Sequence, residues 1–181
     1  RHENNQSKID FGIGLHTGKV MMGIIGDEER NDANVLSDAV NLASRLESLT
    51  KAYSTAGIIS GETYHLVKSN PYFKFRFLGK VKVKGRNEGL DIYEILNIED
   101  PDILDKKIIT LDNYSLGMKF YFEKDFTQSA LYLKKVLEIN PHDMNARRYL
   151  QFSAKFACDT GRSTYRLRGL LSNIQLRSEE H

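Results

Sequence analysis

The sequence predicts an α+β fold followed by a helical unit, and three observations lead to this prediction. Apolar, glycine-punctuated runs of strand length occupy IDFGIGLHTG and KVMMGIIG, and FKFRFLGKVKVKG alternates almost strictly between two faces. Between these runs, apolar residues at helical spacing follow Ser37 and Asp38. Beyond about Asn97 the alternation gives way to helical spacing alone. We therefore expect helices that cover a mostly antiparallel sheet, followed by a helical segment.

The elements of the first part are predicted in the order strand, strand, helix, strand, helix, strand, strand. The two glycine-punctuated runs are expected to pair through a turn at Thr17 and Gly18, and DEERNDAN is expected to be a polar loop. The helix AVNLASRLESLTK begins at the candidate N-caps Ser37 and Asp38. The remaining elements are predicted in AGIIS, GETYHLVKS, FKFRFLGKVKVKG and LDIYEIL.

The second part is predicted to be helical. Residues 98–110 are polar, contain Pro101 and are expected to form a linker, while residues 161–181 form a basic tail. Residues 111–160 resemble a tetratricopeptide repeat, a helix-turn-helix unit of about 34 residues. The matching positions are Gly117, Phe120, Phe126, Ser129, Val136 and Pro141. Because one such repeat cannot bury its own face, we expect it to pack on the first unit, on further repeats or on a protein partner.

Composition and charge exclude several function classes. The chain has 26 basic and 24 acidic residues and a net charge of +2, so its charge does not indicate a nucleic acid or a membrane surface as partner. The single cysteine, Cys158, excludes an internal disulfide framework and favours a cytoplasmic setting. No apolar run is long enough to span a membrane. Because the chain begins at Arg1, we expect the natural protein to start upstream, where a membrane or sensor region would lie.

The glycines of GIGLHTG raise the question of a phosphate-binding loop. Gly12, Gly14 and Gly18 do not have the spacing of the dinucleotide fingerprint, and a strand rather than a helix is predicted to follow them. We therefore expect these glycines to permit a tight turn and close backbone packing. His16, in the same turn, is expected to be an ordinary histidine at the end of a strand.

The first unit resembles the class III nucleotide cyclase catalytic domain. The motifs that carry the resemblance run from about Ile9 to Leu96: HTGKVMMGIIGDEERNDANVLSDAVNLASRLESLTK, ISGETY and FLGKVKVKG, of which DAVNLASRLE is the most specific. The resemblance implies a ferredoxin-like sheet covered by helices, and a head-to-tail homodimer. It also implies conversion of ATP to cyclic AMP, or of GTP to cyclic GMP, with release of pyrophosphate.

The same resemblance identifies two candidate catalytic residues. Asn41 and Arg45 occupy the family's N-x-x-x-R motif, whose side chains act on the substrate held by the partner subunit. A fixed guanidinium opposes the negative charge that develops when the ribose 3′-oxygen attacks the α-phosphorus, and an amide can orient the ribose. From spacing alone, the alternative is that Arg45 pairs with Glu29 or Glu47 on a solvated face.

Three further residues are candidates for substrate binding. Lys84, in VKVKG, matches the family lysine that holds the terminal phosphates, whereas Lys80 and Lys82 are expected to be ordinary exposed charges. Lys19 matches a position that is often basic near the pyrophosphate. Asn34 occupies the base-reading position, and because its amide both donates and accepts, it leaves ATP and GTP open.

The family's metal-binding aspartates have no counterpart in this chain. Family members bind two Mg or Mn ions through two aspartates N-terminal to the part seen here, and Asp10, Asp27 and Asp32 do not match those motifs. We therefore assign no metal ligand and expect the ligands, together with the first strands of the sheet, upstream of this chain. Without two metals the attacking hydroxyl is not activated, so the isolated chain is expected to be inactive.

These observations predict the C-terminal part of an intracellular signalling cyclase, most consistent with cyclic AMP production. The alternative from another class is a non-catalytic module, in which a degenerate cyclase half dimerises and the repeat binds a peptide. Nucleic-acid binding through the lysine strand and the basic tail is not predicted, because the aromatic residues there do not form a stacking platform.

Overall fold

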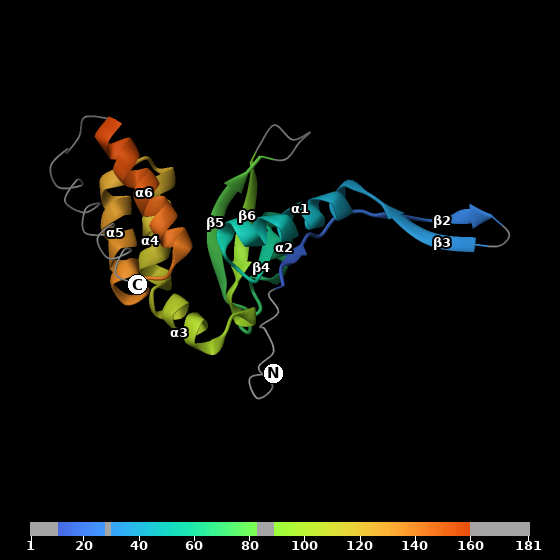
Figure 1. Cartoon of the computed structure of the whole chain (residues 1–181), viewed down its shortest axis with the longest axis horizontal. Coiled ribbons are helices and arrows are strands. Elements are labelled where there is room, and N and C mark those ends of the chain that lie inside the picture. Colours follow the sequence, from blue (N-terminus) through green and yellow to red (C-terminus); the bar gives the residue numbers. More distant parts are fainter. Residues whose placement is uncertain (1–10, 28–29, 83–88, 160–181) are drawn as a thin grey trace, which may run out of the picture. The chain divides into compact units, whose positions relative to one another are not determined.

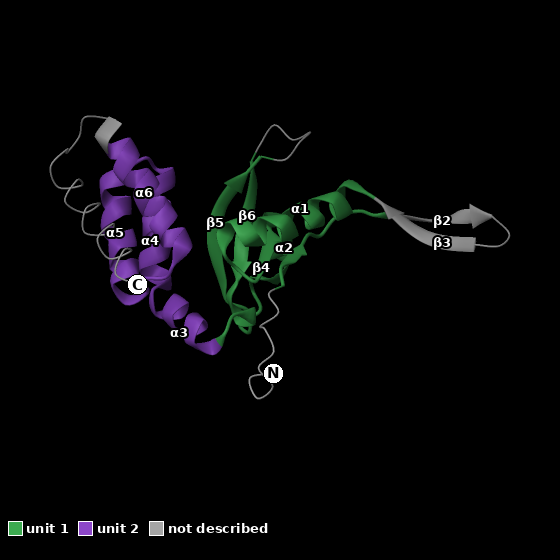
Figure 2. Ribbon diagram, in the orientation of Figure 1, with its two compact units in different colours: residues 1–100 green, residues 101–181 purple. Residues whose placement is uncertain are grey.

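The computed structural model divides the chain into two compact units, Arg1–Asp100 and Pro101–His181 (Figures 1 and 2). It describes residues 11–27, 30–82 and 89–159, and for residues 22–27, 30–36, 158 and 159 it describes the backbone alone. Among the described residues, no helix combines the length and the apolar character needed to cross a membrane. Each unit is described below by itself.

The first unit contains a four-stranded sheet and a separate two-stranded one. Its elements are β1 (Ile13–Leu15), β2 (Met21–Asp27), β3 (Arg30–Leu36), α1 (Asp38–Tyr53), β4 (Gly57–Ser60), α2 (Gly61–Val67), β5 (Phe75–Val81), β6 (Leu90–Ile95) and the 3₁₀ turn η2 (Leu96–Ile98). The strand order is β1-β4-β6-β5, in which only β1 and β4 are parallel. The predicted α+β fold, with helices packed on a mostly antiparallel sheet, is confirmed.

Two predictions about the N-terminal strands are wrong. The runs containing β1 and β2 do not pair with each other, because β1 pairs with β4 and β2 pairs with β3. The segment DEERNDAN is also not a loop throughout, since β3 forms an antiparallel ladder with β2 from Met21↔Leu36 to Asp27↔Arg30. Hydrophobic alternation reports burial of one face of a strand, whereas a ladder of backbone hydrogen bonds forms with polar side chains as well.

Helix α1 is capped at both ends and supplies one side of the core. The Ser37 hydroxyl accepts a hydrogen bond from the Val40 amide at 3.3 Å, as predicted for this N-cap. At the other end, Ser54 adopts the left-handed conformation and its amide donates to the Lys51 carbonyl. The core that this helix shares with the sheet consists of Leu42, Leu46, Ile58, Leu78, Leu90 and Ile92.

Two aromatic side chains pack on the opposite face of the sheet. Tyr93 alternates with the buried Ile92 along β6 and therefore points away from α1. The ring of Tyr64, from α2, stacks on it at a centroid distance of 3.8 Å. Burial raises the pKa of Tyr93 from 10.0 to about 12, and the nearby Asp91 and Tyr64 add to the effect.

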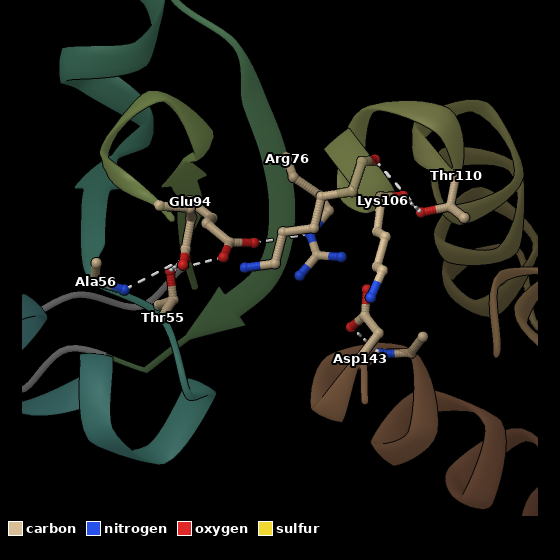
Figure 3. Close-up of polar contacts among 10 residues, drawn as sticks. Thr55, Ala56, Arg76, Glu94, Lys106, Thr110 and Asp143 are labelled. Atoms are coloured by element: carbon tan, nitrogen blue, oxygen red, sulfur yellow. Dashed lines mark hydrogen bonds and ion pairs between the residues drawn. The ribbon is translucent and has the colours of Figure 1, made fainter. Parts of the chain in front are cut away.

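A buried ion pair joins the last two strands. Arg76 lies opposite Glu94 in the register of β5 and β6, and the Arg76 Nε donates to Glu94 Oε2 at 2.7 Å, with side chains 1% and 0% exposed. Thr55, just after α1, donates its hydroxyl to Glu94 Oε1 at 2.7 Å (Figure 3). This cluster ties the C-terminal end of α1 to the sheet.

A β-bulge changes the predicted alternation of β5. The register shifts between Phe77 and Gly79, and Gly79 has a φ of 134°, a conformation that favours glycine. As a result the successive residues Leu78 and Gly79 are both buried. Before the bulge, Arg76 is buried and its neighbour Phe77 is half-buried. Arg76 and Leu78, rather than Phe75 and Phe77, therefore lie on the most buried face of β5.

The second unit consists of helices. These are α3 (Pro101–Ile109), α4 (Leu111–Phe122), α5 (Phe126–Ile139) and α6 (Met144–Asp159), so the predicted linker 98–110 contains α3. Helix α5 packs against both α4 and α6. Small residues allow these contacts, since Gly117 faces Leu133 and the buried hydroxyls of Ser129 and Ser153 lie 2.9 Å apart. Helical structure in 111–159 is as predicted, whereas its assignment to a tetratricopeptide repeat stays a prediction.

Candidate functional site

Helix α1 presents Asn41 and Arg45 on its exposed surface. The two residues are one helical turn apart, and both side chains are exposed. They are held there because Leu42 and Leu46, the residues that follow them, are 5% and 0% exposed in the core. The face that carries the two candidate catalytic residues is therefore fixed by the burial of the neighbouring face.

The predicted alternative for Arg45 is an ion pair with Glu29 or Glu47 on a solvated face. Within residues 11–27, 30–82 and 89–159 no ion pair joins Arg45 to Glu47. Glu29 lies outside the described residues. Residues two positions apart on a helix do not face each other, so the exposed Arg45 guanidinium is not paired with Glu47.

The turn after β1 lies next to the first turns of both helices of this unit. The His16 side chain is 5% exposed, and its Nδ1 lies 2.8 Å from the Ser60 hydroxyl at the N-cap of α2. A Cβ added to Gly18 would lie 2.9 Å from the Cβ of Ala39, so the backbone of the turn contacts the first turn of α1. Lys19 follows directly and is exposed.

Close packing explains the other glycines of GIGLHTG. A Cβ on Gly14 would lie 2.2 Å from the Ala43 carbonyl oxygen and from the Glu47 amide nitrogen. A Cβ on Gly12 would meet the Thr50 hydroxyl at the same distance. Strand β1 and helix α1 thus approach more closely than a side chain would allow, which agrees with the packing role predicted for these glycines and not with a phosphate loop.

The remaining candidate residues are only partly described. Asn34 lies in β3 opposite Gly23, and its side chain is not described. Lys84 lies outside the described residues. Lys80 and Lys82 are exposed as predicted, and Lys80 pairs with Asp91 at 2.9 Å on the neighbouring strand.

The described residues do not form a metal site. In the part of the chain that the structure describes, no three His, Cys, Asp or Glu side chains converge as metal ligands would. Asp10 lies outside this part, and the side chains of Asp27 and Asp32 are not described. The described donor set therefore does not fit the two divalent ions that the resemblance implies.

Sequence reasoning missed the contacts of His16. It treated this histidine as an ordinary strand end, yet its ring is buried and bonded to a serine 44 residues away. A local signal existed at the other partner, because Ser60 and Thr63 in ISGETY form an N-terminal helix cap. Nothing in the sequence around His16 specified that this cap was its partner.

The chain belongs to the family described as the adenylate and guanylate cyclase catalytic domain. The family's sequence profile matches residues 1–97, more than half of the chain. This match covers the helix with Asn41 and Arg45, the HTG turn and the last strands of the sheet.

Relatives of known name agree with this membership. The chain is 35% identical over 146 residues to "Adenylate cyclase, terminal-differentiation specific" of Dictyostelium discoideum, covering 80% of this chain and 7% of that protein. It is 43% identical over 89 residues to "Adenylate cyclase" of Anabaena cylindrica, covering 49% of this chain and 18% of that protein. It also resembles "Guanylyl cyclase, membrane" of D. discoideum, with 38% identity over 80 residues, covering 43% of this chain and 5% of that protein.

Among solved structures, the adenylyl cyclase CyaB from P. aeruginosa is 31% identical, with a TM-score of 0.44, over 55% of this chain and 47% of that one. The chain thus spans a small fraction of its named relatives, 7% of the first and 18% of the second. The match to the D. discoideum adenylate cyclase is longer than the 97 residues of the family profile, so it continues into the helical unit.

Proposed function

We propose that this chain is part of a nucleotide cyclase that converts ATP to 3′,5′-cyclic AMP and pyrophosphate in intracellular signalling. One observation carries the proposal: Asn41 and Arg45 are exposed one turn apart on a helix whose opposite face is anchored in the core. Membership in the cyclase family supports the reaction type. The adenylate cyclase names of the relatives at 35% and 43% identity support ATP over GTP.

The chemistry of these two side chains suits the reaction. The ribose 3′-oxygen attacks the α-phosphorus, releases its proton to solvent, and displaces pyrophosphate as the bond to the bridging oxygen breaks. Negative charge develops on the phosphate oxygens, and the Arg45 guanidinium, with five N–H donors in a planar fork, stabilises it. The Asn41 amide donates to and accepts from the ribose and holds it for in-line attack.

The proposed site is shared between two subunits. Because both side chains are exposed, they can act on a substrate held by the second copy of a homodimer. Lys19 and Lys84 would contact the phosphates, and Asn34 the base. The two Mg or Mn ions would be held by aspartates outside this chain, so no step here is assigned to them.

We also propose that residues 111–160 are a tetratricopeptide-like unit that regulates the cyclase or binds a protein partner. The contacts of α5 with both α4 and α6, through small residues such as Gly117 and Ser129, support it. Removing residues 101–181 from the full-length protein would leave both the rate and partner binding unchanged if this unit had no such role.

The test is the turnover of the full-length protein with manganese and either ATP or GTP. We expect the substitution Arg45→Ala to lower kcat by about a hundredfold or more, because one preorganised charge is lost from the transition state. Arg45→Lys keeps the positive charge but lacks the planar fork of N–H donors. Its kcat should therefore lie between those of the wild type and Arg45→Ala. The control is Lys51→Ala, which removes an exposed positive charge from the last turn of the same helix.

Three outcomes separate the alternatives. An Arg45→Ala enzyme with the wild-type rate would overturn the site assignment while leaving the cyclase activity. A full-length protein that turns over neither nucleotide would favour a non-catalytic dimerisation and peptide-binding module. A preference for GTP over ATP would correct the substrate and leave the role of Arg45 intact.

A further inference from the structure

The buried histidine His16 anchors the turn that follows β1 to the start of α2. Its Nδ1 lies 2.8 Å from the Ser60 hydroxyl, and both side chains are almost completely buried. The same hydroxyl caps α2 by accepting a hydrogen bond from the Thr63 amide at 3.2 Å. The Glu62 carboxylate is 4.0 Å from the same ring nitrogen. His16 is therefore bonded to the group that begins the helix.

A second contact ties the same turn to the same helix. The hydroxyls of Thr17 and Thr63 lie 3.1 Å apart, and that of Thr63 is also 3.1 Å from the Ser60 hydroxyl. Two successive residues of the turn thus bond the N-cap residue of α2 and a residue of its first turn. Such linked hydroxyl networks restrict side-chain rotation more than a single contact does.

On its other side the turn contacts α1. Gly18 packs so closely on Ala39 that an added Cβ would lie 2.9 Å from the Ala39 Cβ and 3.1 Å from the His16 Nε2. Ala39 is in the first turn of α1, two residues before Asn41. Lys19 is the residue after Gly18. The turn is thus anchored to the start of α2 on one side. It ends at Lys19, and on its other side it contacts the first turn of α1, which leads to Asn41.

We infer that His16 is a positioning residue for the cyclase reaction, an inference that rests on the proposed function. Held by Ser60, the imidazole fixes the backbone of residues 16–19, and this backbone sets the place of Lys19 and of the first turn of α1. His16 does not contact the reacting atoms. Its effect on the rate comes from geometry, because small displacements of groups that bind the transition state have large effects on rate.

The nature of the contact suggests a matched pair of substitutions. His16→Phe keeps an aromatic ring in the buried space and removes the bond to Ser60. His16→Asn places an amide close to the position of Nδ1 and can restore that bond. The control is His65→Phe, because His65 is an exposed histidine in α2.

The first measurement is the steady-state rate of the full-length protein with manganese and ATP. We expect His16→Phe to lower kcat by roughly tenfold to a hundredfold with a smaller change in KM, and His16→Asn to recover most of the rate. His65→Phe should match the wild type. Ser60→Ala removes the bond from its other end, so its effect should not add to that of His16→Phe.

The second measurement does not depend on turnover. We expect faster amide hydrogen exchange in residues 37–42 of the His16→Phe protein, and nearly wild-type exchange in His16→Asn, because the anchored turn supports the start of α1. If His16→Phe does not fold, the Ser60→Ala and His16→Asn proteins test the same bond.

The inference is overturned if His16→Phe keeps the wild-type kcat and exchange, or if His16→Asn and His16→Phe behave alike. A wild-type protein without turnover would overturn the proposed function instead, and the exchange measurement would still decide whether His16 holds α1.

Discussion

Each unit of this chain encloses a buried polar pair, and the two pairs differ in charge. The sheet unit encloses a charged pair, Arg76 and Glu94, with side chains 1% and 0% exposed. The helical unit encloses a pair of neutral hydroxyls, Ser129 and Ser153, 2.9 Å apart. A buried charge is costly unless its partner is present, whereas a buried hydroxyl costs far less when it is left alone. The Arg76–Glu94 pair is therefore expected to tolerate the loss of one partner much less well than the Ser129–Ser153 pair does.

Gly14 of the sheet unit and Gly117 of the helical unit differ in what they face. Gly14 faces backbone atoms of α1, which cannot move without moving the helix. Gly117, in α4, faces the side chain of Leu133, whose nearest atom would lie 2.7 Å from an added Cβ. A side chain can change its rotamer, while a helix backbone cannot. The same substitution is thus expected to have unequal effects at these two positions.

The largest expected effect comes from breaking the charged pair. Glu94→Ala should lower the free energy of unfolding of the sheet unit by about 3–5 kcal/mol, because Arg76 is left charged and buried. Ser153→Ala, the matched change in the helical unit, should cost about 1–3 kcal/mol. Urea denaturation of the 181-residue chain, followed by circular dichroism, measures both. The double substitution Arg76→Met with Glu94→Leu should cost less than Glu94→Ala alone, and a larger cost would contradict this account.

Replacing Gly14 and Gly117 by alanine should also destabilise the sheet unit more than the helical unit, but the difference should be smaller than for the polar pairs. Gly14→Ala should destabilise the sheet unit by about 3 kcal/mol, at the upper end of overpacking effects, because the new methyl group meets backbone. Gly117→Ala should cost about 1 kcal/mol or less, since Leu133 can shift and alanine favours the helix. Thermal unfolding of both variants tests the difference. Equal costs would show that the α1 backbone yields as easily as a leucine side chain.

The smallest expected effect is the pH dependence that Tyr93 gives to the stability of the sheet unit. Burial raises the pKa of Tyr93 to about 12, so between pH 10 and 12 the folded chain holds a proton that the unfolded chain has lost. This contribution to stability is complete below pH 10.0 and is lost as the pH rises toward 12. The urea midpoint should therefore fall more steeply over this range in the wild type than in Tyr93→Phe. If the urea midpoints of the wild type and Tyr93→Phe fell equally with pH, Tyr93 would have the same pKa in the folded and unfolded chain.

Much of the candidate site could be predicted because its signals are local. The Ser37 cap, the apolar spacing that buries Leu42 and Leu46, and the consequent exposure of Asn41 and Arg45 all lie within one helix. Helical spacing alone therefore specifies which face carries the two candidate residues. The motif around them supplied the family, which the sequence comparison shows independently.

The sequence by itself therefore determined helix α1, its Ser37 cap and the face that carries Asn41 and Arg45. Tertiary structure alone decided that β1 pairs with β4, that β3 is a strand, and that a bulge at Gly79 accompanies the burial of Arg76. It also decided the bond between His16 and Ser60. The physical reason is distance along the chain: a helix is closed by hydrogen bonds to residues four positions away, whereas strand pairing and buried polar contacts depend on partners that no local pattern specifies.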